Sequence, residues 1–315
     1  MTPHFGSFVL RRALTSIALV LIVASFALLL ARLAPGDHLS EFEMSSAAVQ
    51  AERHRLGLDR PLPRQYLAWL RRVLVLDLGE STRDPGRAVS ALIAERVGNT
   101  LLLGILALIV ATVLGLPLGI VAGSGNRGAA LAAARATNIV LLSLPPVLLS
   151  LGFLLLAART GWFPVGGLPP VAGIAERLRY LVLPVLALGL PVAASLERLQ
   201  ARSLAAALTH PSISAARARG IPRGRVVWGH AFKLSLTPVL AVYGVIVGSL
   251  ISGSFAVEYV MTWPGLGRLM YDGLVSRDAN VVAGCAATGA AFLALGVFLA
   301  DVLLALVDPR LAEGR

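Results

Sequence analysis

Long runs of apolar residues alternate with shorter polar segments along most of the chain. A helix needs roughly 20 apolar residues to cross a lipid bilayer. Six runs are long enough, and they cover residues 13–33, 98–123, 136–158, 180–200, 235–257 and 282–307. The run at 13–33 is too long for the apolar region of a cleaved signal peptide, so we expect it to be retained. The pattern therefore predicts an all-α membrane protein with six transmembrane helices.

The polar segments predict how the chain is organised across the membrane. Segments 1–12, 124–135, 201–234 and 308–315 together hold twelve basic and two acidic residues. Because basic residues favour the cytoplasmic side, we expect these segments and both termini there. The expected organisation is an N-terminal segment with the first helix (1–33), an extracytoplasmic segment (34–97), a membrane core (98–307) containing the cytoplasmic loop 201–234, and a cytoplasmic tail (308–315).

Segment 34–97 is too long and too polar to be a simple turn. Its apolar residues recur with helical spacing at Tyr66, Leu67, Leu70, Val73 and Leu74. We expect a small cap on the outer side of the membrane that contains one or two helices.

Composition narrows the class of protein. Hydrophobic residues make up 57% of the chain and charged residues 14%, whereas soluble domains carry roughly 25% charged residues. A net charge of +11 is also typical of proteins that bind nucleic acids. Here the arginines lie between apolar runs and form no single face, so we expect no nucleic-acid partner. The only cysteine, Cys285, cannot form an internal disulfide.

The chemistry-bearing residues predict no catalytic, cofactor or metal site in this chain. A Walker A motif requires Gly-Lys-Ser/Thr, and the only lysine, Lys233, follows a phenylalanine. The histidines all fall outside the apolar runs, at His4, His38, His54, His210 and His230. No nucleophile and base can be assembled inside the runs, which disfavours a membrane enzyme. A stand-alone secondary transporter or channel stays open as an alternative.

Charges inside apolar runs are candidates for function. Asp301 lies about one to two turns from the end of the last run. It can act in a proton or ion relay, or it can pair with an arginine near the interface. Arg32, Glu197 and Arg198 lie at the ends of runs, where long side chains reach the membrane surface.

The basic segment "THPSISAARARGIP" (209–222) predicts a short helix in the cytoplasmic loop. Pro211 suits the first helical turn. Gly220 can adopt the left-handed conformation that ends a helix, and Pro222 prevents continuation. Ile213 and Ala216 fall on one face. Small residues for contact and arginines at the rim indicate a helix that docks into a groove of a partner; a solvated or lipid-binding loop is the alternative.

This segment resembles the EAA-type coupling loop of ABC importer permeases, in particular the first-subunit type of the dipeptide/oligopeptide/nickel permease family. The matching positions are Ala216, Arg217, Ala218, Arg219, Gly220, His230, Ala231 and Pro238. The ordered segments "LARLAPGD" (30–37), "LDLGES" (76–81), "EYVMTWPGLGRLMYDGLVSRD" (258–278) and "DVLLALVDPRL" (301–311) extend the resemblance over nearly the whole chain. The chain departs from the pattern at Ser214, which replaces the glutamate that names the loop.

The resemblance implies the type I ABC importer permease fold in a bacterial or archaeal plasma membrane. The implied partners are a second homologous permease, two ATPase subunits that bind ATP and Mg, an extracytoplasmic substrate-binding protein and membrane lipid. The implied ATPase-coupling residues are Ile213, Ser214, Ala215, Ala216, Arg217, Ala218, Arg219, Gly220 and Ile221. The resemblance also implies a gating role for Trp263, Pro264 and Gly265. The alternative is that these residues form an ordinary turn between two spans. The substrate is left open among peptides, nickel chelates, opines, glutathione and sugars.

Overall fold

The computed structural model describes residues 3–33, 50–51, 54–55, 59–125, 128–168 and 173–307, and helices account for most of them. The principal helices are α1 (Pro3–Leu33), α3 (Leu62–Leu74), α4 (Val89–Gly123), α5 (Ala129–Ser143), α6 (Pro146–Thr160), α7 (Ile174–Ala207), α8 (Pro211–Ala218), α9 (Arg223–Arg225), α10 (Phe232–Val260), α11 (Leu266–Val275) and α12 (Ala279–Val307). A π-helical turn, η2 (Val226–Ala231), joins α9 to α10. The expected all-helical membrane fold is confirmed.

Five of the six predicted spans are continuous helices. Within the described ranges, α1, α4, α7, α10 and α12 each contain a segment long and apolar enough to cross a membrane. The expectation of one helix over 136–158 is wrong, because this run is divided into α5 and α6, which meet at 109°. Leu144 precedes Pro145 and has an extended backbone. A residue before proline is sterically driven out of the helical region, and Pro146 then begins the next helix.

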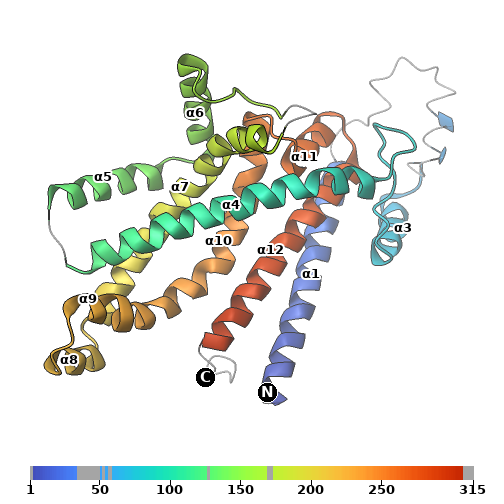
Figure 1. Cartoon of the computed structure of the whole chain (residues 1–315). Helices are drawn as coiled ribbons and strands as arrows, with labels where there is room; N and C mark the ends of the chain where they lie inside the picture. Colours follow the sequence, from blue (N-terminus) through green and yellow to red (C-terminus); the bar gives the residue numbers. More distant parts are fainter. Residues whose placement is uncertain are drawn as a thin grey trace.

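Helices α4 and α7 pack closely along their length (Figure 1). Small residues recur every fourth position on α4 at Ala107, Ala111, Gly115, Gly119 and Gly123, and four of these are buried. A Cβ atom added at Gly119 would lie 2.6 Å from the Cβ of Gln200. This spacing lets the two backbones approach each other, as small residues do in membrane helix pairs.

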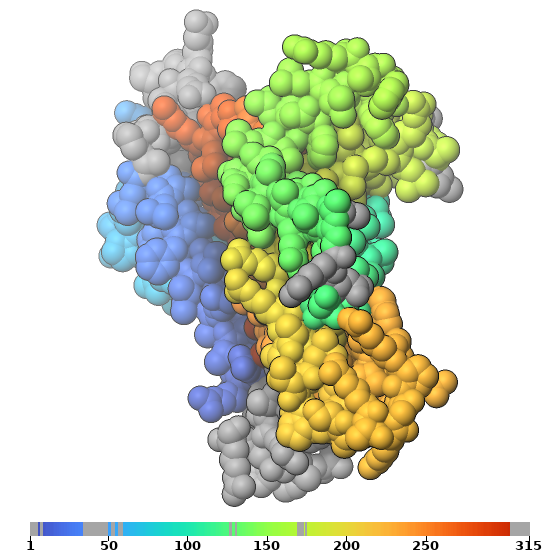
Figure 2. Space-filling view, turned by 90° about the vertical axis from the view of Figure 1, so that its left-hand side faces the viewer, coloured from blue at the N-terminus to red at the C-terminus, as the bar shows by residue number. Residues whose placement is uncertain are grey.

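Helix α1 lies beside α12 (Figure 1), and α3 contacts α1 near its C-terminal end. Its outward side chains are strongly exposed, and Figure 2 shows α1 in blue along the edge of the molecule. Trp69 of α3 packs in a cluster with Leu28 of α1 and Ala283 of α12. The predicted α3 helix is confirmed, but Leu67 and Leu74 are exposed because Tyr66, Trp69, Leu70 and Val73 form the packed face.

Two ends of the helical bundle can be distinguished. The N-terminal end of α1, the C-terminal end of α12 and the α8–α9 turn lie at one end, called here the α8 end (Figures 1 and 2). Helices α6 and α11 lie at the opposite end. Much of 34–58 and the predicted tail 308–315, with its Asp-Pro-Arg sequence, lie outside the described residues.

Candidate functional site

Helix α8 begins where the sequence predicts. Pro211 occupies the first helical position, where its missing N–H requires no partner. The Nδ1 atom of His210 accepts a hydrogen bond from the backbone N–H of Ser212 at 3.3 Å. This side-chain cap satisfies one of the free N–H groups at the helix start.

The end of α8 is equally well defined. Gly220 has a φ of +77°, in the left-handed region that favours glycine. Its N–H donates to the carbonyl of Arg217 at 2.9 Å, and the N–H of Ile221 donates to the carbonyl of Ala216 at 3.3 Å. These two bonds form a Schellman motif, which satisfies the last helical carbonyls. The predicted helix and its glycine stop are confirmed.

One face of α8 packs against its own chain. Ile213 and Ala216 are 1% and 7% exposed. They belong to a cluster with Ile120, Leu204, Ala207, Val226, Val227 and Ala231, which come from α4, α7 and η2. Ile213 and Ala216 lie on one face, as the sequence predicts, and this face fixes α8 to the ends of neighbouring helices.

The other face of α8 is free within the described chain. Its exposed residues are Ser214, Ala215, Arg217, Ala218 and Arg219. The guanidinium of Arg223, just beyond the helix, donates to the carbonyl of Ser124 at 2.8 Å and so ties this turn to the end of α4. The exposed face of α8 therefore consists of small residues and arginines. Its packed face is attached to the ends of α4 and α7 and to η2.

The "WPGLG" turn at the opposite end is buried. Trp263 is 2% exposed, and its indole Nε1–H donates to the carbonyl of Asn99 at 3.2 Å. The amide of Asn99 donates in return to the carbonyl of Pro264 at 2.7 Å. Trp263 therefore attaches α11 to α4 and presents almost no surface to another protein.

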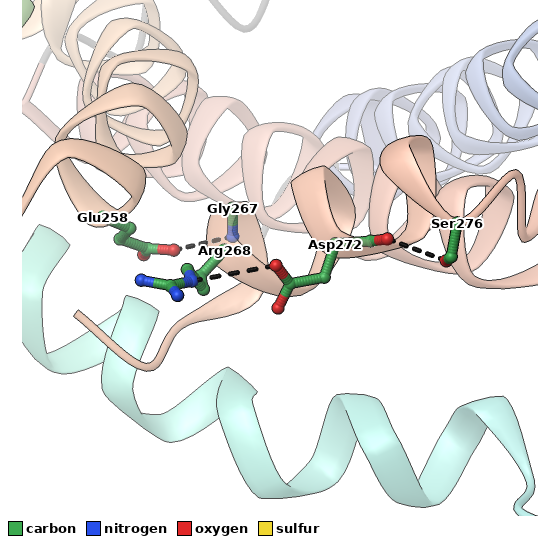
Figure 3. Close-up of polar contacts among 5 residues, drawn as sticks. All are labelled: Glu258, Gly267, Arg268, Asp272 and Ser276. Carbon is green, nitrogen blue, oxygen red and sulfur yellow. Dashed lines mark hydrogen bonds and ion pairs between the residues drawn. The ribbon is translucent and has the colours of Figure 1, made fainter. Parts of the chain in front are cut away.

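A buried carboxylate caps α11. Glu258, at the end of α10, accepts a hydrogen bond from the N–H of Gly267 at 2.6 Å (Figure 3). The hydroxyl oxygen of Thr100 accepts a hydrogen bond from the N–H of Leu266 at 2.8 Å. A Cβ on Gly265 would overlap the Glu258 carboxylate, so a larger residue there would have to displace this cap. Within α11, Arg268 and Asp272 form an ion pair of 3.8 Å (Figure 3).

A second buried carboxylate joins distant parts of the chain. Asp278 is fully buried, and its Oδ2 accepts hydrogen bonds from the Ser81 hydroxyl at 2.6 Å and from the N–H groups of Thr82 and Arg83 at 2.8 and 3.2 Å. Its Oδ1 accepts the N–H of Val281 at 3.1 Å and caps α12. Asp278 was not predicted from the sequence, although an aspartate immediately before an apolar helical run is a known start signal.

Polar side chains also meet between α5, α7 and α10. Glu197 was expected at a span end, but α7 continues to Ala207 and leaves Glu197 9% exposed, with its carboxylate accepting the Asn138 amide. The amide of Gln200 donates to the Ser235 hydroxyl at 2.8 Å. Because α7 continues beyond the predicted apolar run, Glu197 lies in the interior of the helical bundle and not at its surface.

Asp301 lies 3.0 Å from the guanidinium of Arg12 on α1. This geometry favours the ion-pair interpretation over a proton relay. Among the described residues, no three His, Cys, Asp or Glu side chains lie close enough together to hold a metal ion.

The apolar spans and the exposed basic turn at the α8 end define an integral membrane protein. Comparison with known proteins identifies it as a transport component: residues 115–313 match the family described as binding-protein-dependent transport system inner membrane component, and residues 5–103 match the family described as binding-protein-dependent transport system membrane component, N-terminal. The chain belongs to this family.

Named relatives span almost the whole chain. The oligopeptide transport system permease protein AppB of Bacillus subtilis is 32% identical and covers 97% of this chain and 99% of its own length. A putative peptide permease protein of Brucella ovis is 32% identical, with coverage of 96% and 98%. The dipeptide transport system permease protein DppB of Bacillus subtilis is 28% identical, with coverage of 96% and 97%. The chain is therefore a multi-pass permease subunit of an ABC importer, which decides against a stand-alone transporter or channel.

Proposed function

We propose that this permease forms half of a peptide translocation pathway together with a second homologous permease. The peptide class is supported by the names of the relatives, which are peptide, oligopeptide and dipeptide permeases. Two ATPase subunits, which bind ATP and Mg, and an extracytoplasmic binding protein complete the proposed assembly. The chain crosses the membrane six times with the bent α5–α6 pair as one crossing, and the α8 end faces the cytoplasm with both termini.

The proposed function of α8 is to receive the movement of an ATPase subunit. One observation carries this proposal: α8 has an exposed face with Arg217 and Arg219, while its opposite face is packed on α4, α7 and η2. A displacement of α8 must therefore displace the ends of these helices. ATP can drive the cycle only if the ATPase subunits bind it with different affinity in the inward- and outward-facing states.

Gly220 offers a test of this coupling. A Cβ at Gly220 would meet no atom within 4 Å, so the effect of Gly220→Val comes from backbone conformation alone. The left-handed region costs a non-glycine residue roughly 1–2 kcal/mol, so we expect the end of α8 to rearrange and transport per ATP hydrolysed to fall. The measurement is peptide uptake and ATP hydrolysis by the reconstituted complex.

Gly224→Val is the matched control, because Gly224 lies in the same turn with open space around it and without a positive φ. We expect it to retain the parent ratio of uptake to hydrolysis. Equal ratios in parent, Gly220→Val and Gly224→Val would contradict a coupling role for the end of α8.

Photo-crosslinking tests the docking surface directly. A photoreactive residue at exposed Ala215 is expected to capture an ATPase subunit, whereas one at Trp162, which is 71% exposed at the opposite end, is expected not to do so. Failure at Ala215 in a complex that still hydrolyses ATP would place the docking surface elsewhere.

A further inference from the structure

A pocket of about 540 Å³ opens between α1, α3 and the start of α12. Its apolar and aromatic lining residues include Leu28 from α1 and Tyr66 and Trp69 from α3. Its polar lining residues include Arg32, Arg72 and Asn280, and Arg32 donates to the Asn280 side chain at 3.3 Å. The pocket lies far from α8 and includes none of the residues assigned above to coupling.

The pocket carries a marked excess of positive charge. Five arginines line it, at Arg32, Arg55, Arg60, Arg64 and Arg72, whereas its carboxylates are Asp77 and Glu80. Glu80 lies 3.7 Å from Arg55, and Asp77 accepts the N–H of Gly79 at 2.8 Å. Among the described lining residues, two carboxylates are too few to balance the charge of five arginines.

Three of these arginines have no partner in the part of the chain that the structure describes. Arg60, Arg64 and Arg72 line the pocket, and no side-chain hydrogen bond or ion pair to another described residue satisfies them. A guanidinium presents a planar fork of N–H donors that matches the oxygens of a phosphate. Several such groups facing one cavity favour an anion with several acceptor oxygens.

The position of the pocket identifies the source of the anion. The apolar part of α1 that can cross a membrane ends at Leu33, one residue after Arg32. Tyr66 and Trp69 stack with ring centroids 6.0 Å apart beside the pocket, and such aromatic residues concentrate at membrane–water interfaces. Leu67 on the same helix is 53% exposed. A pocket lined by both apolar side chains and arginines at the end of a span fits a lipid better than a water-exposed acidic protein surface.

We propose that this pocket binds the phosphate of an anionic phospholipid, with Arg64 and Arg72 of α3 as principal ligands and the acyl chains directed along α1. The lipid would fix α3 against α1 and α12 on the side of the membrane opposite α8. Free phosphate shares the chemistry of the headgroup but not its apolar part, so the two ligands can be separated by experiment.

The test uses the intact complex in nanodiscs of phosphatidylcholine with increasing phosphatidylglycerol. Phosphatidylglycerol bound to the complex is measured by native mass spectrometry. A basic residue near the membrane surface changes anionic lipid binding by about fivefold. We therefore expect Arg64→Gln and Arg72→Gln each to reduce phosphatidylglycerol retention about fivefold, and the double variant by about 25-fold.

Arg71→Gln is the matched control, because Arg71 is an exposed neighbour on α3 that does not line the pocket. It is expected to retain phosphatidylglycerol like the parent. Equal retention by the parent and the double variant would overturn the proposal. So would displacement of phosphatidylglycerol by inorganic phosphate, which would indicate a free-anion site. Unchanged lipid retention with lost binding-protein association would instead assign the pocket to an acidic protein surface.

Discussion

The α4–α7 contact makes a sharp prediction at Gly119. In Gly119→Ala the new Cβ would lie 2.6 Å from the Cβ of Gln200 and 2.7 Å from the carbonyl oxygen of Glu197. Carbon atoms pack best at roughly 3.5–4.0 Å. The carbonyl belongs to a helix backbone, so the two helices must separate by about 1 Å. Overpacking of this kind costs about 1–3 kcal/mol, which exceeds the gain of up to about 1 kcal/mol from replacing glycine in a helix.

Thermal unfolding of the purified permease in mild detergent measures this effect. A loss of 1 kcal/mol lowers Tm by about 2–4 °C in chains of 150–250 residues, so Gly119→Ala should lower Tm by several degrees. Gly98→Ala is the control on the same helix, because a Cβ there meets no atom within 4 Å. We expect its Tm to stay the same or rise. Equal Tm values for the two variants would refute the argument that backbone proximity at Gly119 controls stability.

Three further changes test other parts of the structure. Asp278→Asn removes the carboxylate that accepts hydrogen bonds from three N–H groups and one hydroxyl. We expect the free energy of unfolding to fall by about 1–3 kcal/mol and trypsin to cleave faster at Arg83. An unchanged cleavage rate would contradict this expectation. A double-mutant cycle on Arg12 and Asp301, which are 45% and 21% exposed, should give a coupling energy of no more than about 1 kcal/mol, and unchanged transport in both single variants would argue against a proton relay. Cys285 is fully buried, so a maleimide should label it only after unfolding, and rapid labelling of the folded permease would contradict its burial.

Local signals explain what could be predicted from the sequence. Pro211, Gly220 and Pro222 act on the backbone within a few residues, and the structure ends α8 where these residues predict. The five continuous spans were also predictable, because a run of about 20 apolar residues has few alternatives to a membrane helix. The small-residue repeat at Gly115, Gly119 and Gly123 was visible in the sequence, but a repeat does not identify its partner helix.

Remote contacts explain what could not be predicted. Asp278 lies almost 200 positions from Ser81, and the sequence gives no indication that they meet. Ile213 and Ala216 were placed on one face correctly, but whether that face meets another protein or the same chain depends on how α7 and η2 fold around it. Pro145 and Pro146 indicate the break at Leu144. We nevertheless predicted one helix there, because the apolar run is long enough to cross a membrane.

The same break determines what must surround the α5–α6 pair. The last carbonyl groups of α5 lose their helical partners where the chain turns at Leu144. Hydrocarbon offers no hydrogen bonds, and each unsatisfied backbone group costs several kcal/mol there. The exposed carbonyls at this corner therefore require protein or water around them. In the proposed assembly, a neighbouring subunit or a water-filled pathway would supply this polar environment, which lipid alone does not.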